Sequence, residues 1–164
     1  MTDLQALLSY YEQYLCDRLF RYTLSNGIVI EVSFYREAFC HLLGLQHITD
    51  NRRYIGKAGY ERIRSGKLTT RQLKNMNRAG FAKIKGRIDF FSHIGHLMEH
   101  GGIFRFYPER AGSTRIRANF LVHEESCGLH QHLFLAQESP KSNTYAPMSY
   151  IALTERDDNP MLYV

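Results

Sequence analysis

Residues 114–136 read TRIRANFLVHEESCGLHQHLFLA, and the alternation of side-chain types in this stretch decides the fold. Successive side chains of a strand point to opposite faces of a sheet. From Ile116 to Val122 every second residue is apolar, and beyond the EESCG turn Leu129, Leu133 and Leu135 share one parity. The pattern therefore predicts strands over 114–123 and 129–136 that share one apolar face.

The rest of the last third of the chain follows the same period. Residues 103–107 and 145–154 are rich in strand formers and are separated by turn clusters, so they predict two further strands. The final MLYV, residues 161–164, is compatible with an added edge strand. The C-terminal part therefore indicates an antiparallel meander.

Helical periodicity dominates the preceding residues. Apolar side chains at helical spacing and Gly or capping signals at the ends predict helices over 2–21, 36–43, 59–65, from Thr69 onward, and 81–101. Between the first two, Asn26 and Gly27 separate two strand-like runs and predict a hairpin with a type I′ turn. We expect an α+β fold in which N-terminal helices and a hairpin pack on one face of a four- to five-stranded antiparallel sheet.

Composition predicts one ordinary domain over residues 1–164. Hydrophobic residues make up 44% of the chain and charged residues 23%, which is typical of a globular protein. Three scattered cysteines without a CxxC pair indicate reduced thiols. There is no apolar run long enough to span a bilayer and no signal-peptide pattern, so we expect a cytoplasmic protein that does not bind membranes.

Positive charge is concentrated in one part of the chain. Residues 52–87 hold 12 of the 21 Lys and Arg residues and only one acidic residue, Glu61, which gives this basic block a formal charge of 12 − 1 = +11. Clustered positive charge attracts polyanions, and nucleic acid is the commonest of them. A solvated helical face is the alternative interpretation. The residues expected to bind nucleic acid are Arg52, Arg53, Lys57, Arg71, Lys74 and Arg87.

The face of the two central strands that points away from the apolar side carries proton-transferring groups. If the strands pair as a hairpin, this face gathers Arg117, Asn119, His123, His130 and His132. RNA cleavage without a metal needs a base for the ribose 2′-OH, an acid for the departing 5′ oxygen and a cation over the phosphorane. We predict that His132 and His130 supply the base and the acid, with either histidine in either role, and that Arg117 is the cation. Polar residues are also expected on the solvated face of any antiparallel sheet.

Two further sets of residues bear on this face. One of Ser149 and Tyr150 must point the same way as the histidines, and either is a candidate phosphate ligand, although core packing is the ordinary role of a tyrosine. The HxH pair also allows a zinc-dependent hydrolase, but HExxH and paired CxxC motifs are absent. We therefore expect no metal and no cofactor.

The segment FYREAFCHLLGLQHI, residues 34–48, resembles a nuclease family of mobile genetic elements, the fourth class of phage-associated barnase, EndoU, colicin and RelE-like nucleases. Its distinctive part is HLLGL at 41–45, and the likeness continues through the basic helices and FAKIKGRIDFF at 81–91 to the late Pro147. The resemblance implies helices packed on an antiparallel sheet and a metal-independent, toxin-like ribonuclease. It marks His41, for which a catalytic role and a role in bracing the short helix both stay open.

The residues and the resemblance together predict an endoribonuclease that binds RNA through the basic block and cleaves it on the exposed sheet face. A toxin-like enzyme of this kind would be paired with an antitoxin or immunity protein. A non-catalytic nucleic-acid-binding module on the same scaffold is the first alternative, and the zinc-dependent hydrolase is the second.

Overall fold

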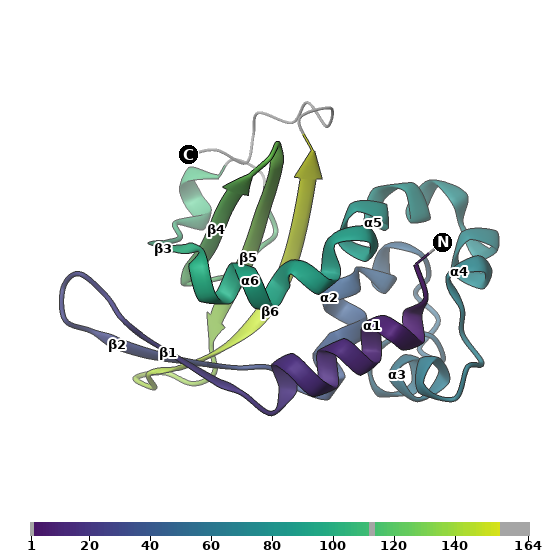
Figure 1. Cartoon of the computed structure of the whole chain (residues 1–164), viewed down its shortest axis with the longest axis horizontal. Coiled ribbons are helices and arrows are strands. Elements are labelled where there is room, and N and C mark those ends of the chain that lie inside the picture. Colours follow the sequence, from purple (N-terminus) through teal and green to yellow (C-terminus); the bar gives the residue numbers. More distant parts are fainter. Residues whose placement is uncertain (1, 112–113, 155–164) are drawn as a thin grey trace. The chain divides into compact units, whose positions relative to one another are not determined.

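The computed structural model describes residues 2–111 and 114–154, and they form two compact units. One unit comprises the chain up to Arg18 together with Phe34–Gly95, and the other comprises Leu19–Ser33 together with the chain from His96 onward. The first unit is helical and the second holds the sheet (Figure 1). The predicted α+β class is confirmed, whereas the single domain stays a prediction.

The helical unit consists of five α-helices and short connecting turns. They are α1 (Leu4–Tyr11), α2 (Phe39–Leu43), α3 (Gly56–Arg64), α4 (Thr70–Met76) and α5 (Arg78–Phe90). A one-turn π-helix, Glu12–Cys16, prolongs α1. The first helix therefore ends before the predicted Arg21, and Leu19, which continues its apolar spacing, starts a strand and is 55% exposed. The predicted capping box of α4 is confirmed at Thr69 and Gln72.

Aromatic rings hold the core of the helical unit together. Tyr11 of α1 packs against Phe39 of α2 with ring centroids 5.1 Å apart, and Phe39 meets Phe91 edge-on at 5.3 Å. All three side chains are fully buried. The Tyr11 hydroxyl donates to the Tyr35 carbonyl at 2.7 Å, so burial of this ring leaves no polar atom unsatisfied. These contacts tie α1 to α2, which carries the HLLGL segment.

The second unit is built on a six-stranded sheet with the order β1-β2-β6-β5-β4-β3. The strands are β1 (Leu19–Thr23), β2 (Val29–Ser33), β3 (Gly102–Arg105), β4 (Phe120–Ser126), β5 (Leu129–Gln137) and β6 (Thr144–Thr154). All neighbours are antiparallel except β2 and β6, which are parallel. The predicted hairpin exists, but it extends the sheet instead of lying on its face, which raises the strand count to six and makes the sheet mixed. The MLYV segment lies outside the described residues.

Helix α6 (Ile94–His100) covers one face of the sheet (Figure 1). A Cβ on Gly101 would lie 2.9 Å from Cγ1 of Val122, and Nε2 of His96 lies 2.9 Å from Oε1 of Glu124. Val122 and Glu124 share one parity of β4, so His123 and Glu125 point to the other face.

The long helix predicted over 81–101 is interrupted by a 3₁₀ turn at Phe91–His93, which separates α5 from α6.

Candidate functional site

Three imidazoles stand together on the face of β4 and β5 opposite α6. His123 pairs directly with His132 across the two strands, and Glu125 pairs with His130. The rings of His123 and His132 are stacked with centroids 4.7 Å apart, and those of His123 and His130 are 6.4 Å apart. We call His123, His130 and His132 the histidine face. The pattern of alternation placed these three side chains together, and the structure does the same.

The histidines differ in their exposure to solvent. His132 is buried, with 1% of its surface exposed, whereas His123 and His130 are half-buried. Burial, followed by the neighbouring imidazoles of His123 and His130, lowers the pKa of His132 to about 4. The pKa of His123 is also lowered, first by burial and then by His130. Both His123 and His132 are therefore neutral at neutral pH and can accept a proton or a hydrogen bond.

A carboxylate accompanies His130 on this face. Nδ1 of His130 lies 3.6 Å from Oε2 of Glu125, whose side chain is 61% exposed. When His130 is protonated, the two groups form an ion pair. The site therefore contains one imidazole beside a carboxylate and two imidazoles that are neutral at neutral pH, and an acid–base pair can be drawn from them.

The late serine and tyrosine lie on opposite faces of the sheet. Ser149 pairs with Phe134, which has the parity of His132, so the half-buried Ser149 belongs to the histidine face. Tyr150 pairs with Leu133 on the other face, where it is fully buried and donates from its hydroxyl to Oε1 of Gln131 at 2.8 Å. Tyr150 is thus a core residue, and the structure removes it as a candidate phosphate ligand.

Arg117 is not placed beside the histidines by strand pairing. The predicted strand from Thr114 begins only at Phe120, because the segment before it forms local hydrogen bonds, such as the one from Ile116 N to Thr114 Oγ1. Arg117 is exposed in this irregular segment. Asn119 is held by the hydrogen bond that its Oδ1 accepts from Gln137 N at 2.8 Å. The parity argument therefore fails for Arg117, and its catalytic role stays a prediction.

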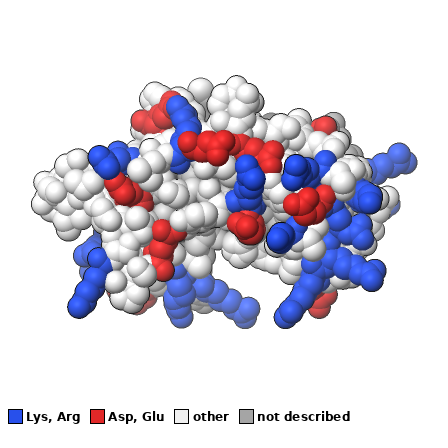
Figure 2. Space-filling view, turned by 90° about the horizontal axis from the view of Figure 1, so that it is seen from below, with Lys and Arg blue, Asp and Glu red and all other residues white. Residues whose placement is uncertain are grey.

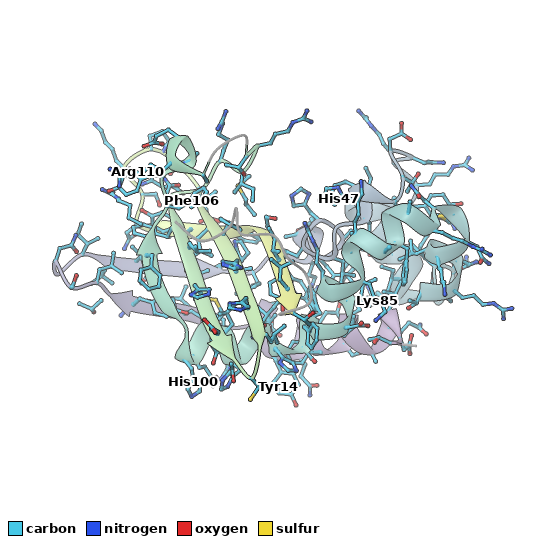
Figure 3. The ribbon with its side chains drawn as sticks, turned by 90° about the horizontal axis from the view of Figure 1, so that it is seen from above. Tyr14, His47, Lys85, His100, Phe106 and Arg110 are labelled. Atoms are coloured by element: carbon cyan, nitrogen blue, oxygen red, sulfur yellow. The ribbon has the colours of Figure 1, made fainter. Side chains whose placement is uncertain are left out.

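The aromatic surroundings limit how the histidine face can be approached. Phe106, labelled in Figure 3, packs edge-on against Phe134 with centroids 5.0 Å apart. Phe134 in turn lies 6.4 Å from the ring of His132.

Among residues 2–111 and 114–154, no group of three or more His, Cys, Asp or Glu side chains is arranged to hold a metal ion.

The basic block lies in the helical unit, and its charges are mostly exposed. Figure 2 shows Lys and Arg side chains gathered over this unit. Arg52 and Arg53 precede α3, Lys57 lies on α3, and Arg71 and Lys74 lie on α4. All five of these predicted contacts are exposed. Two ion pairs occur in this part of the described chain, Arg64 with Glu61 at 3.9 Å and Lys85 with Asp89. Most of the positive charge is therefore not neutralised locally.

His41 and Arg87 belong to the same unit but have different surroundings. His41 is exposed on α2, while the flanking residues Phe39, Cys40, Leu42 and Leu43 are buried. The buried side chains on either side of His41 thus give the short helix its apolar core. Arg87 on α5 is half-buried, unlike the five exposed cations.

His123 is the residue that the sequence argument placed on the face without assigning it a catalytic role. The missing signal was the register. A two-residue turn at Cys127 and Gly128 pairs Ser126 with Leu129. His123 lies three residues before Ser126 and His132 three residues after Leu129, so this register places the two histidines directly across from each other. The register therefore distinguishes His123 from the other polar residues of the same parity.

A comparison with protein families matches residues 3–161, nearly the whole chain, to the family described as phage-Barnase-EndoU-ColicinE5/D-RelE like nuclease4. The chain belongs to this family. The expected resemblance is confirmed, and membership indicates a nuclease. No curated protein and no solved structure matched the chain at a significant level. No helix of the described residues is long and apolar enough to cross a membrane.

Proposed function

We propose that this nuclease is an endoribonuclease that cleaves RNA without a metal ion, by general acid–base chemistry on the histidine face. The observation that carries the proposal is the stack of three imidazoles with His123 directly across from His132. Family membership supports the nuclease part of the proposal. The choice of RNA is supported by the chemistry of the site, because imidazoles can activate the ribose 2′-OH and DNA has no such group.

The proposed reaction uses one imidazole as the base and one as the acid. The base removes the 2′-OH proton, the 2′ oxygen attacks phosphorus, and the bond from phosphorus to the 5′ oxygen breaks as the acid donates a proton to that oxygen. The products are a 2′,3′-cyclic phosphate and a 5′-hydroxyl. We assign the base to His123, whose lowered pKa keeps it neutral, and the acid to His130, which lies beside Glu125.

His132 is assigned a positioning role in this reaction. Because it is 1% exposed, it contacts the two other histidines more readily than a substrate. Its ring stacks on that of His123 and fixes its orientation. Arg117 remains the proposed cation for the phosphorane and Ser149 the proposed phosphate ligand, while the basic block is proposed to bind the RNA backbone.

The test is cleavage of RNA by the purified chain in the presence of EDTA. We expect fragments that carry 2′,3′-cyclic phosphate ends, and we expect His123→Ala and His130→Ala each to lower kcat about 10²-fold or more. His100→Ala is the matched control, because His100 is an exposed histidine on α6, which covers the opposite face (Figure 3). Its activity should equal that of the unchanged protein.

Two other outcomes would replace the proposal. RNA that is bound but stays intact would identify a non-catalytic nucleic-acid-binding module. Activity that is abolished by EDTA and restored by zinc would identify a metal-dependent hydrolase, the second alternative. An inhibitory partner, such as an antitoxin or immunity protein, is proposed only for the case in which expression of the active chain arrests growth.

A further inference from the structure

The HLLGL segment turns back against α5 at one glycine. Gly44 has φ +86° and ends α2 in the left-handed conformation. A Cβ at this position would lie 2.8 Å from Cγ2 of Ile84, and 3.2 Å from both Cδ and Nη1 of Arg87. Only glycine fits here, for reasons of both backbone conformation and space. The distinctive part of the segment therefore brings its backbone into contact with a guanidinium group.

This guanidinium is buried and incompletely bonded. Nη1 of Arg87 is inaccessible to solvent and has no hydrogen-bond partner among the described residues. Burial lowers the pKa of Arg87, which means that the charged form is held at a cost. The nearest carboxylate along the helix, that of Asp89, is bound to Lys85. A buried cationic nitrogen without an acceptor is unfavourable, and an anion would relieve it.

His47 has three cationic or titratable neighbours, and one of them is Arg87. The pKa of His47 is lowered first by burial and then by the charges of Arg87, His41 and Lys83, in that order. His41, His47 and Lys83 are all exposed, so the cluster is open to solvent on the side of these residues. An ordinary solvated face would instead carry separated and fully exposed cations, like Arg71 on α4. This cluster differs in that three such groups, one of them the half-buried Arg87, act on a single imidazole.

We propose that Arg87, with His41, His47 and Lys83 around it, forms a binding site for a single phosphate group, closed on one side by the backbone at Gly44. Guanidinium and imidazolium groups are strong donors to phosphate oxygens, and glycine at position 44 leaves room for the Arg87 side chain beside the turn. The site lies in the helical unit and is distinct from the histidine face. It rests on the proposed function only in taking its phosphate from the RNA backbone.

The site is tested by titrating the isotope-labelled full chain with inorganic phosphate and following the ring-nitrogen signals of His47 by NMR. A bound anion should offset the surrounding positive charge, so the pKa of His47 should rise at saturating phosphate. Arg87→Gln should weaken phosphate binding about tenfold or more, because a charge-assisted pair of hydrogen bonds is lost. Arg87→Lys keeps the positive charge but loses the planar guanidinium group. Its affinity for phosphate should therefore lie between those of the Arg87→Gln protein and the unchanged protein.

Arg105→Gln is the control, since it removes one positive charge from an exposed position of the other unit, outside the basic block. It should bind phosphate like the unchanged protein. Equal affinities of the Arg87→Gln and Arg105→Gln proteins would overturn the proposal, as would the absence of a saturable change at His47. If Arg87→Gln does not fold, Arg87→Lys provides the same comparison through the signals of His47.

Two competitors distinguish the sources of the phosphate group. A 2′-deoxy oligonucleotide, which cannot undergo the proposed cleavage, presents phosphodiesters, and a nucleoside monophosphate presents a phosphomonoester. Competition by the oligonucleotide would support binding of the RNA backbone. Competition by the monophosphate alone would overturn that assignment. No step of this experiment depends on cleavage, so its result stands even if the chain does not cleave RNA.

Discussion

His132 is the residue whose surroundings most limit its chemistry. Its ring is buried between strands and stacked on His123, and both effects favour the neutral form. A ring that is neutral and inaccessible cannot exchange protons directly with a substrate, but it can hold its exposed neighbour in place. Alternation along β5 identified the face of His132 from sequence. It could not identify the burial, because the exposed fraction of a side chain depends on tertiary packing and not on alternation along one strand.

The depressed pKa of His132 predicts a loss of stability in mild acid. The ring titrates near its ordinary pKa of 6.5 in the unfolded chain and at about 4 in the folded protein, so the unfolded state binds more protons between these values. The stabilisation is present above pH 6.5 and is lost as the pH falls toward 4. Between pH 7 and pH 5 the free energy of unfolding should fall by about 2 kcal/mol from this residue alone.

Urea denaturation of the full chain at pH 7 and pH 5 measures this effect. His132→Gln removes the titrating ring, so its free energy of unfolding should change less with pH than that of the unchanged protein. His100→Gln, at an exposed histidine, should retain the original dependence. An undiminished pH dependence in His132→Gln would contradict the prediction.

The two hairpin turns show that the geometry of a turn depends on the strands that it joins as well as on its own residues. The Asn26–Gly27 dipeptide predicts a type I′ turn, yet only Gly27 there has a positive φ, and Gly27 N donates to Leu24 O at 2.8 Å. The loop is therefore longer than the two residues of a type I′ turn, and Gly27 in it has the left-handed conformation. The type I′ geometry occurs instead at Cys127 and Gly128, with φ 51° and 74°.

Cys127 is therefore a poor residue in the turn that sets the register of the histidine face. A non-glycine side chain is strained at positive φ, and asparagine tolerates that conformation best. Cys127→Asn should raise the free energy of unfolding by about 0.5–1 kcal/mol, and Cys127→Val should lower it, because β-branched residues are the most strained there. Denaturant unfolding of both variants measures the difference. Equal stability of the two proteins would rule out strain at this position.

The boundaries of the elements were the least predictable part of the fold. Leu19 continues the apolar spacing of α1 but pairs with Ser33 across a hairpin, because strand formation by residues 19–23 outweighs the helical period. Ile116 continues the alternation of β4 but precedes the strand, where a threonine side chain satisfies its backbone. In both cases the periodic pattern extends past the element, and the hydrogen-bonding partner of the backbone decides where the element ends.

At the scale of the whole molecule, positive charge and proton-transferring groups occupy different units. The basic block belongs to the helical unit, and the histidine face belongs to the sheet. Sequence counting could find the charge concentration because the residues 52–87 are contiguous. It could not show which cations are exposed: Arg52 and Arg53 are, whereas Arg87 is half-buried. This division predicts that substrate affinity and chemical rate can be changed independently.

Replacing Arg52, Arg53 and Lys57 together by Gln should weaken RNA binding and leave the proton-transfer groups in place. Each contact between a cation and a phosphate releases a counterion, so affinity falls as the salt concentration rises. Removing three contacts should reduce the magnitude of the slope of log affinity against log salt concentration by about 2. His130→Ala should leave this slope unchanged while abolishing cleavage. A control variant with Arg105, Arg110 and Arg115 replaced by Gln removes the same charge from exposed positions of the other unit. If that control lowers the slope equally, binding follows net charge, and the basic block has no special role.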